Sequence, residues 1–185
     1  GLSGFNFMDA EFYEVINDSL PNTDIRKSTI AEQLKSVKTE AELNSMRRAG
    51  RVADEGYQML TDILKPGITE LEAASLVYAA MFANGAQGIA YDIMVQSGEN
   101  TGVLFKRPTD RKIQDGDIVM ADIGCRVNNW AADAARTWAV GDVDPEHREL
   151  MEKCQKGYEN SLNKIHAGMT GAEAHEIVAK EYEKL

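Results

Sequence analysis

Two β-prone segments, residues 118–127 and 130–140, stand on either side of the pair Asn128-Asn129 and predict a β-hairpin. Asn tolerates a positive φ, and both central residues of a tight two-residue turn require one. A turn at these two residues fixes which residues of the two strands lie opposite each other. It therefore also fixes which side chains share a face, because side chains alternate between faces along a strand.

The register that this turn sets places two aspartates on one face of the hairpin. Asp122 lies opposite Ala135 and Asp133 lies opposite Gly124, and directly opposed residues share a face. Asp122 and Asp133 are then diagonal neighbours, with backbone positions roughly 7–8 Å apart. The rest of this face carries mostly small side chains, namely Met120, Gly124, Ala131, Ala135 and Thr137. The opposite face carries core material, namely Val119, Ile123, Cys125, Val127, Trp130, Trp138 and Val140.

Two carboxylates on a small-residue face have two interpretations. Like charges on one sheet face repel, and burial raises the cost unless one carboxylate is protonated or a cation binds. Paired carboxylates with room for water suit a divalent metal ion. Alternatively, both aspartates lie on a solvated face of an edge hairpin, since acidic side chains are mostly exposed in proteins. The spacing by itself leaves both interpretations open.

Capping boxes of the form T-x-x-E predict where three helices begin. They start at Thr39, Thr69 and Thr170, where the Thr hydroxyl accepts from a helical N–H and the Glu reaches back. Asp144-Pro145 predicts a further start, with proline at the first helical position. The predicted helices cover residues 9–18, 29–37, 40–64, 70–83, 145–167 and 171–185. Helices, then a strand-rich block, then helices again indicate an α+β fold.

The composition narrows the class of protein. The 185 residues include 30 acidic and 20 basic side chains, and the net charge of −10 argues against a general nucleic-acid binder. The sequence contains no apolar run near the ~20 residues that span a bilayer, and its first residues lack the pattern of a signal peptide. The two cysteines, Cys125 and Cys154, suit a reducing compartment. We therefore expect a cytoplasmic location, with no nucleic-acid or membrane partner.

Longer motifs surround the two aspartates. The pattern G-D-x-V-x-x-D-x-G occupies residues 116–124, and D-x-x-R-T-x-x-V-G occupies residues 133–141. Before them come LKPGITELEAA (64–74), VQSGEN (95–100) and RPTDRKIQDGD (107–117). From about residue 25 onward, the order and spacing of these motifs resemble the creatinase, aminopeptidase P, prolidase and methionine aminopeptidase family, the "pita-bread" metallopeptidases. The RPTDR stretch is most similar to the Xaa-Pro peptidase branch.

The resemblance implies an α+β pita-bread fold, in which helices flank a curved antiparallel sheet. Similar enzymes hold two divalent metal ions with two Asp, one His and two Glu, and Asp122 and Asp133 match the two Asp. Manganese is the expected metal, with cobalt, zinc or iron as alternatives. The implied reaction is hydrolysis of the peptide bond before proline by a metal-bridged hydroxide. Two alternatives are a creatinase-like hydrolase of a C–N bond in a small molecule and a non-catalytic pita-bread binding domain.

The match also has gaps. In the family, the His and the two Glu ligands come from segments that follow the last helix predicted here, and His166, His175 and Glu176 do not replace them. We therefore expect residues 1–24 to be the exit of a missing N-terminal domain and residues 25–185 to be the N-terminal part of the catalytic domain. On this interpretation the chain alone lacks peptidase activity. It would act on peptides or dipeptides as a homodimer, or with a second chain that supplies the missing half.

Phe105 is a further departure from the family pattern. Relatives commonly carry a His at this place, just before the RPT motif, and that His contacts the substrate. Phe cannot donate a proton or a hydrogen bond, and losing a donor of this kind typically costs ~10²–10³ in rate. We therefore predict no catalytic residue in this chain. Either the chemistry is altered, or Lys106 substitutes, or Phe105 has a simple packing role.

Overall fold

The chain divides into two compact units, Gly1–Asn44 and Ser45–Leu185. The computed structural model describes residues 8–184. Residues 1–7 lie outside the described part. They belong to the segment 1–24, which we assign to a preceding domain. The assignment of residues 1–24 and 25–185 to two domains stays a prediction.

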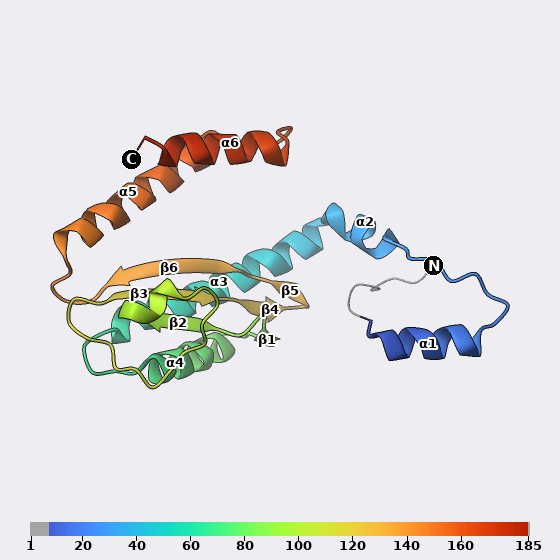
Figure 1. The fold of residues 1–185 in the computed structure, drawn as a ribbon, viewed down its shortest axis with the longest axis horizontal. Coiled ribbons are helices and arrows are strands. Elements are labelled where there is room, and N and C mark those ends of the chain that lie inside the picture. Colours follow the sequence, from blue (N-terminus) through green and yellow to red (C-terminus); the bar gives the residue numbers. More distant parts are fainter. Residues whose placement is uncertain (1–7, 185) are drawn as a thin grey trace. The chain divides into compact units, whose positions relative to one another are not determined.

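The helices begin where the capping residues predict (Figure 1). Thr69 and Thr170 each form a complete capping box, and Thr39 exchanges hydrogen bonds with Glu42 in the same way. The helices are α1 (Ala10–Ser19), α2 (Ile30–Ser36), α3 (Glu40–Ile63), α4 (Glu70–Ala83), α5 (Pro145–Leu162) and α6 (Gly171–Tyr182). Among the described residues, no helix is long and apolar enough to cross a membrane.

Helix α5 is shorter than predicted, because it ends at Leu162 rather than near residue 167. The backbone N–H of Asn163 donates to two carbonyls of the last turn, and the chain then reverses direction. The reversal brings α6 against α5, where the Lys164 ammonium pairs with the Glu181 carboxylate at 2.5 Å. A hydrogen bond of 3.2 Å from the Tyr182 hydroxyl to the Cys154 carbonyl also joins the end of α6 to the middle of α5.

The strand-rich block forms two small antiparallel sheets. One sheet has the order β1-β4-β5 and the other has the order β2-β3-β6. A 3-10 helix, η2 (Gly98–Gly102), directly follows β2. The strands are β1 (Gly88–Ile89), β2 (Met94–Ser97), β3 (Ile118–Ile123), β4 (Cys125–Val127), β5 (Trp130–Ala131) and β6 (Ala134–Ala139).

The predicted hairpin register is confirmed. Asp122 pairs with Ala135, and both turn residues have a positive φ, of 50° at Asn128 and 64° at Asn129. The continuous strands that we predicted are wrong, however, because each is interrupted near Gly124. The Ala132 carbonyl oxygen would lie only 2.3 Å from a Cβ at this glycine. The two segments of the hairpin therefore approach each other too closely there for regular strand pairing between residues that carry side chains.

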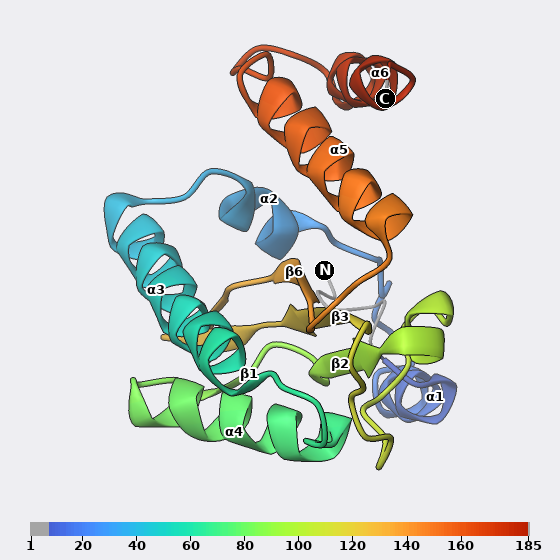
Figure 2. The same ribbon diagram turned by 90° about the vertical axis from the view of Figure 1, so that its left-hand side faces the viewer.

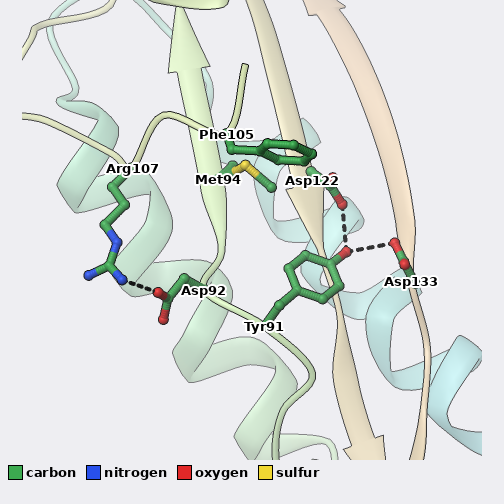
Figure 3. A pocket seen from close by; sticks show the side chains of 7 residues that line it. All are labelled: Tyr91, Asp92, Met94, Phe105, Arg107, Asp122 and Asp133. Atoms are coloured by element: carbon green, nitrogen blue, oxygen red, sulfur yellow. Dashed lines mark hydrogen bonds and ion pairs between the residues drawn. The ribbon is translucent and has the colours of Figure 1, made fainter. Parts of the chain in front are cut away.

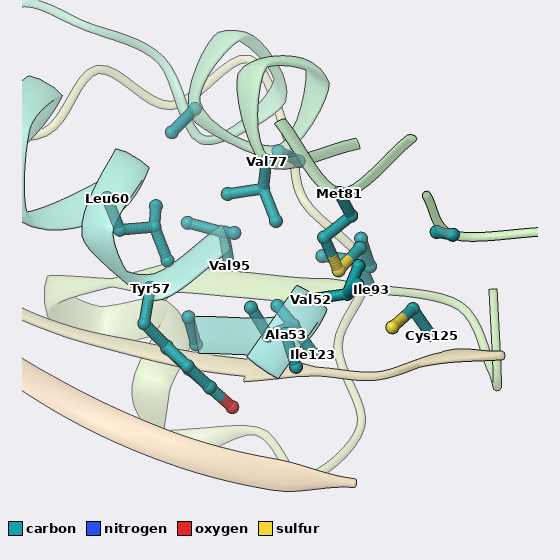
Figure 4. Close-up of a cluster of buried hydrophobic side chains, with 14 of the residues drawn as sticks. Val52, Ala53, Tyr57, Leu60, Val77, Met81, Ile93, Val95, Ile123 and Cys125 are labelled. Carbon is teal, nitrogen blue, oxygen red and sulfur yellow. The ribbon is translucent and has the colours of Figure 1, made fainter. Parts of the chain in front are cut away.

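One face of the β2-β3-β6 sheet packs against helices α3 and α4 and forms the core (Figures 2 and 4). Gly56 of α3 allows the close approach, since a Cβ there would lie 2.8 Å from Ile123 Cδ1. The predicted core face is confirmed for Val119, Ile123, Cys125, Val127 and Val140, all of which are buried. The opposite face carries Asp122 and is half-buried along β3. The core therefore fixes the orientation of the strand that presents this aspartate.

Candidate metal centre

The carboxylates of Asp122 and Asp133 converge on one point, as the hairpin register predicts (Figure 3). The Tyr91 hydroxyl oxygen lies 2.5 Å from Asp122 Oδ1 and 2.9 Å from Asp133 Oδ1. Asp122 belongs to β3 and Asp133 directly precedes β6, so the hairpin supplies both carboxylates. The segment between β1 and β2 supplies the phenol. No sequence pattern indicated that Tyr91 would lie between the two aspartates.

The Tyr91 hydroxyl carries one proton and so donates to one carboxylate at a time. Burial raises the pKa of Tyr91 above its ordinary value, and the hydrogen bonds to Asp122 and Asp133 raise it further. The phenol therefore stays protonated at neutral pH. Two carboxylates that share a single proton donor leave uncompensated negative charge, which a cation held between them would neutralise.

Gly124 is what allows the Tyr91 ring to reach the aspartates. A Cβ at this position would lie 2.8 Å from Tyr91 Cε1, well inside van der Waals contact. It would also meet the Ala132 carbonyl, which belongs to the backbone and cannot rotate away. Only glycine fits between the phenol ring and the neighbouring strand, which gives a physical reason for the glycine in the D-x-G motif.

The two aspartates lie at one end of a pocket of about 470 Å³, a size typical of small-molecule sites. Met94 and Phe105 form an apolar wall beside the aspartates, and Arg107 pairs with Asp92 farther from them (Figure 3). The complete lining is Tyr91, Asp92, Met94, Phe105, Arg107, Asp122 and Asp133. The pocket thus combines an anionic end with an apolar wall and a charged pair.

The structure places Phe105 at the pocket. It is 71% exposed and its ring lines the pocket, so it is not part of the hydrophobic core, and its role stays a prediction. Lys106 is not among the lining residues, and its ammonium donates to the Asn100 side-chain oxygen. The proposal that Lys106 replaces a catalytic His therefore has no support in this geometry.

A buried carboxylate that the sequence analysis missed holds the neighbouring loops. Glu70 is completely buried and accepts hydrogen bonds from Ser97, Asn100 and Thr109, at 2.7–3.1 Å. Burial on its own would raise the pKa of Glu70, but the hydrogen bonds from Thr109, Asn100 and Ser97 outweigh it and lower the pKa. Arg111 extends the network, since it donates to Ser97 Oγ at 2.7 Å and pairs with Asp117. This network fixes both ends of the loop that carries Phe105.

Other residues that the sequence analysis considered lie outside the pocket. His166 and His175 are exposed near and on α6, and Glu176 pairs with Lys180 at 2.8 Å. Burial raises the pKa of Cys125, whose thiol donates to the Ala49 carbonyl, so this thiol is not poised as a nucleophile.

The donor chemistry of the described residues can be compared with what a divalent metal ion requires. Asp122 and Asp133 present carboxylate oxygens to a common point, and oxygen ligands of this kind suit manganese and other divalent ions. Within residues 8–184, no three or more His, Cys, Asp or Glu side chains are grouped so that they could hold a metal ion. The two aspartates fit the ion, but further ligands would have to come from elsewhere.

Comparisons with known proteins agree on the family of these motifs. The model of metallopeptidase family M24 matches residues 44–185. The Xaa-Pro dipeptidase of Lactobacillus delbrueckii subsp. lactis is 27% identical over 178 residues, which are 95% of this chain and 48% of that protein. The Xaa-Pro dipeptidase of Pyrococcus furiosus is 28% identical over 83% of this chain and 45% of its own length. The chain thus spans about half the length of the relatives it matches.

Solved structures share the fold. An Xaa-Pro dipeptidase from Bacillus anthracis superposes with a TM-score of 0.90 at 23% identity, over 97% of this chain and 51% of that structure. The prolidase from Pyrococcus furiosus superposes with a TM-score of 0.86 at 25% identity, over 94% of this chain and 52% of its own. The expected pita-bread fold, present here as a part of the relatives' length, is confirmed.

Proposed function

Because this chain belongs to metallopeptidase family M24, we propose that it forms part of a metal-dependent Xaa-Pro peptidase that hydrolyses the peptide bond before proline. The observation that carries the proposal is the convergence of Asp122 and Asp133 on one point at the end of a pocket. Relatives named Xaa-Pro dipeptidase support the substrate class.

In this proposal, Asp122 and Asp133 hold divalent metal ions together with ligands from outside the described residues. Two such ions, with manganese favoured, would activate water and polarise the scissile carbonyl. Asp133 is exposed and Asp122 is half-buried, so the pair is open to the pocket. Tyr91 would keep the two carboxylates in place through its hydroxyl, and the neighbouring pocket would hold the peptide.

Two other functions stay open as outcomes of the same experiment. The family resemblance implies a His at the position of Phe105, and its replacement by Phe, which lines the pocket, would suit a non-catalytic peptide-binding domain. A creatinase-like hydrolase of a small molecule would work without metal. The homodimer, the second metal ion and the cytoplasmic location are likewise predictions.

The test uses the complete protein that carries this chain, loaded with manganese. We expect release of free proline from an Xaa-Pro dipeptide, loss of this release after chelation, and recovery when manganese is restored. Asp122→Asn and Asp133→Asn should each weaken manganese binding at least tenfold in titration calorimetry. Asp110→Asn, which removes an exposed carboxylate outside the pocket, is the matched control.

Three results would contradict the proposal. Tight manganese binding without any proline release would favour a binding domain. Full activity after exhaustive chelation would favour the metal-free hydrolase. Unchanged manganese affinity in both aspartate variants would show that the metal, if bound, lies elsewhere.

A further inference from the structure

Helix α4 is apolar on its outer face as well as on the face that packs against the core. Val77 and Met81 are completely buried and belong to the core (Figure 4). On the other side of the helix, Leu71 is 50% exposed and Phe82 is 49% exposed. The sequence has no charged side chain between residues 73 and 83. A surface helix normally carries charged residues opposite its apolar face, so the apolar outer face of α4 indicates a binding partner.

The outward-facing residues follow one line along α4, which we call the outer stripe. They recur at positions i, i+4, i+7 and i+11, a spacing that keeps side chains on one face of an α-helix. The outer stripe consists of Leu71, Ser75, Tyr78 and Phe82. Tyr78 is half-buried and the other three are exposed. In both ribbon views the β2-β3-β6 sheet lies on one side of α4 only, which leaves the outer stripe open to a partner (Figures 1 and 2).

The order of side chains in the outer stripe suits a second copy of this chain. A twofold interface brings the same surface of both copies together, so that surface must be complementary to itself. When two copies of α4 pack antiparallel, Leu71 of one copy faces Phe82 of the other. Ser75 then faces Tyr78, because both pairs have the same midpoint in the sequence. The small Ser75 side chain leaves room for the Tyr78 ring of the other copy.

The charges around α4 favour the same antiparallel arrangement. Each copy has a net charge of −10, so two copies repel each other least where the contact surface is uncharged. The exposed Arg48 guanidinium lies next to Gly85, just beyond the C-terminal end of α4, since a Cβ at Gly85 would be 3.3 Å from Arg48 Nη2. Glu72 is exposed in the first turn of the helix. Antiparallel packing therefore brings the end beside Arg48 of one copy toward the end that carries Glu72 in the other.

We propose that the outer stripe of α4 is a contact surface between two copies of this chain, packed as an antiparallel α4–α4 pair. The inference is independent of the proposed peptidase function, because no residue of the outer stripe lines the pocket. Stable interfaces bury about 800 Å² per partner, and the four side chains of the outer stripe bury less than this. We therefore expect reversible association with a dissociation constant in the micromolar range.

The test measures self-association of the complete protein by sedimentation equilibrium over a range of concentrations. Leu71→Lys and Phe82→Glu each place a charge in the outer stripe, and each should raise the dissociation constant about tenfold or more. An equimolar mixture of the two variants should regain most of the lost affinity. In the mixed pair the introduced lysine faces the introduced glutamate, and the remaining Leu71 and Phe82 still face each other.

The matched control is Leu104→Glu. Leu104 is 77% exposed and lies in the loop after η2, outside α4, so its replacement adds a charge at an exposed apolar position away from the outer stripe. This variant should associate like the wild type. A Leu104→Glu variant as weakened as Leu71→Lys would show that added charge acts without regard to position, and would contradict the proposal.

Melting temperatures separate an interface between copies from a contact inside one chain. For an interface between copies, the melting temperature of the wild type rises with protein concentration, and the two charged variants lose this dependence. If both variants instead lower the melting temperature equally at every concentration, another segment of the complete protein covers the outer stripe and the proposal is wrong. A wild type that is monomeric at all concentrations, unchanged association in both variants, or no recovery in their mixture would also overturn it.

Discussion

Replacing Glu70 with glutamine should destabilise the protein strongly although the side chain keeps its shape. The Glu70 carboxylate is completely buried and accepts from the Ser97 N–H at 2.7 Å and the Thr109 N–H at 2.9 Å, one on each oxygen. Glutamine has one acceptor oxygen and one NH₂ group. Whichever way the amide is oriented, one of these backbone N–H groups faces another donor.

The size of the stability loss follows from the number of acceptors that Glu70→Gln leaves for these donors. The hydroxyls of Ser97 and Thr109 can rotate and accept from the new NH₂ group, but a backbone N–H cannot. One buried N–H without an acceptor costs about 1–3 kcal/mol, and the remaining bonds lose the strength that the charge gave them. We expect a loss of about 2–4 kcal/mol in the free energy of unfolding. For a chain of this length that corresponds to a melting temperature lower by about 5–15 °C.

The assay is thermal and urea unfolding followed by circular dichroism, with Glu72→Gln as the control. Glu72 lies on the same helix, but it is exposed and serves the capping box, where glutamine is an accepted substitute. The Glu72→Gln variant should lose less than about 0.5 kcal/mol of the free energy of unfolding. A Glu70→Gln variant as stable as the Glu72→Gln variant would refute the account of the buried network.

The same variant has a predicted pH dependence. Because the folded protein lowers the pKa of Glu70, its ionised form contributes stability above the unfolded pKa of about 4.3. This contribution is lost as the pH falls through the lower folded pKa. The stability difference between wild type and Glu70→Gln should therefore be constant between pH 5 and pH 7, to within about 0.5 kcal/mol. It should shrink below about pH 4, and a difference that grows on acidification would show that the sign is wrong.

Two further predictions concern the hairpin and the isolated chain. Gly124→Ala should lower the melting temperature and weaken manganese binding, because a Cβ there meets a backbone carbonyl at 2.3 Å and Tyr91 at 2.8 Å. A variant with the melting temperature and manganese affinity of the wild type would refute the argument from close approach. These 185 residues alone should show no peptidase activity and should associate in solution. Added manganese should raise their melting temperature little, since two carboxylates bind a divalent ion weakly. A monodisperse monomer with tight metal binding would show that they form a complete domain.

Local sequence determined a large part of the fold. The helix starts at Thr69 and Thr170 depend on partners three residues away, so the T-x-x-E pattern was sufficient to predict them. The turn at Asn128-Asn129 set the register of the hairpin, and the register placed Asp122 and Asp133 on one face. The metal role that we propose for these two aspartates began from this local argument.

Tertiary packing decided the rest of the site. Glu70 and Glu72 occupy the same helical turn, yet only the fold shows that Glu70 is the buried one. There it accepts a hydrogen bond from Ser97, which is 27 positions away. Tyr91 reaches Asp122 and Asp133 across 31 and 42 positions. The loop that carries Phe105 is bonded to Glu70, which is 30 positions from Asn100 and 39 from Thr109. Short-range capping and turn geometry depend on neighbouring residues, whereas these contacts depend on how helix α4, the strands and the loops pack together.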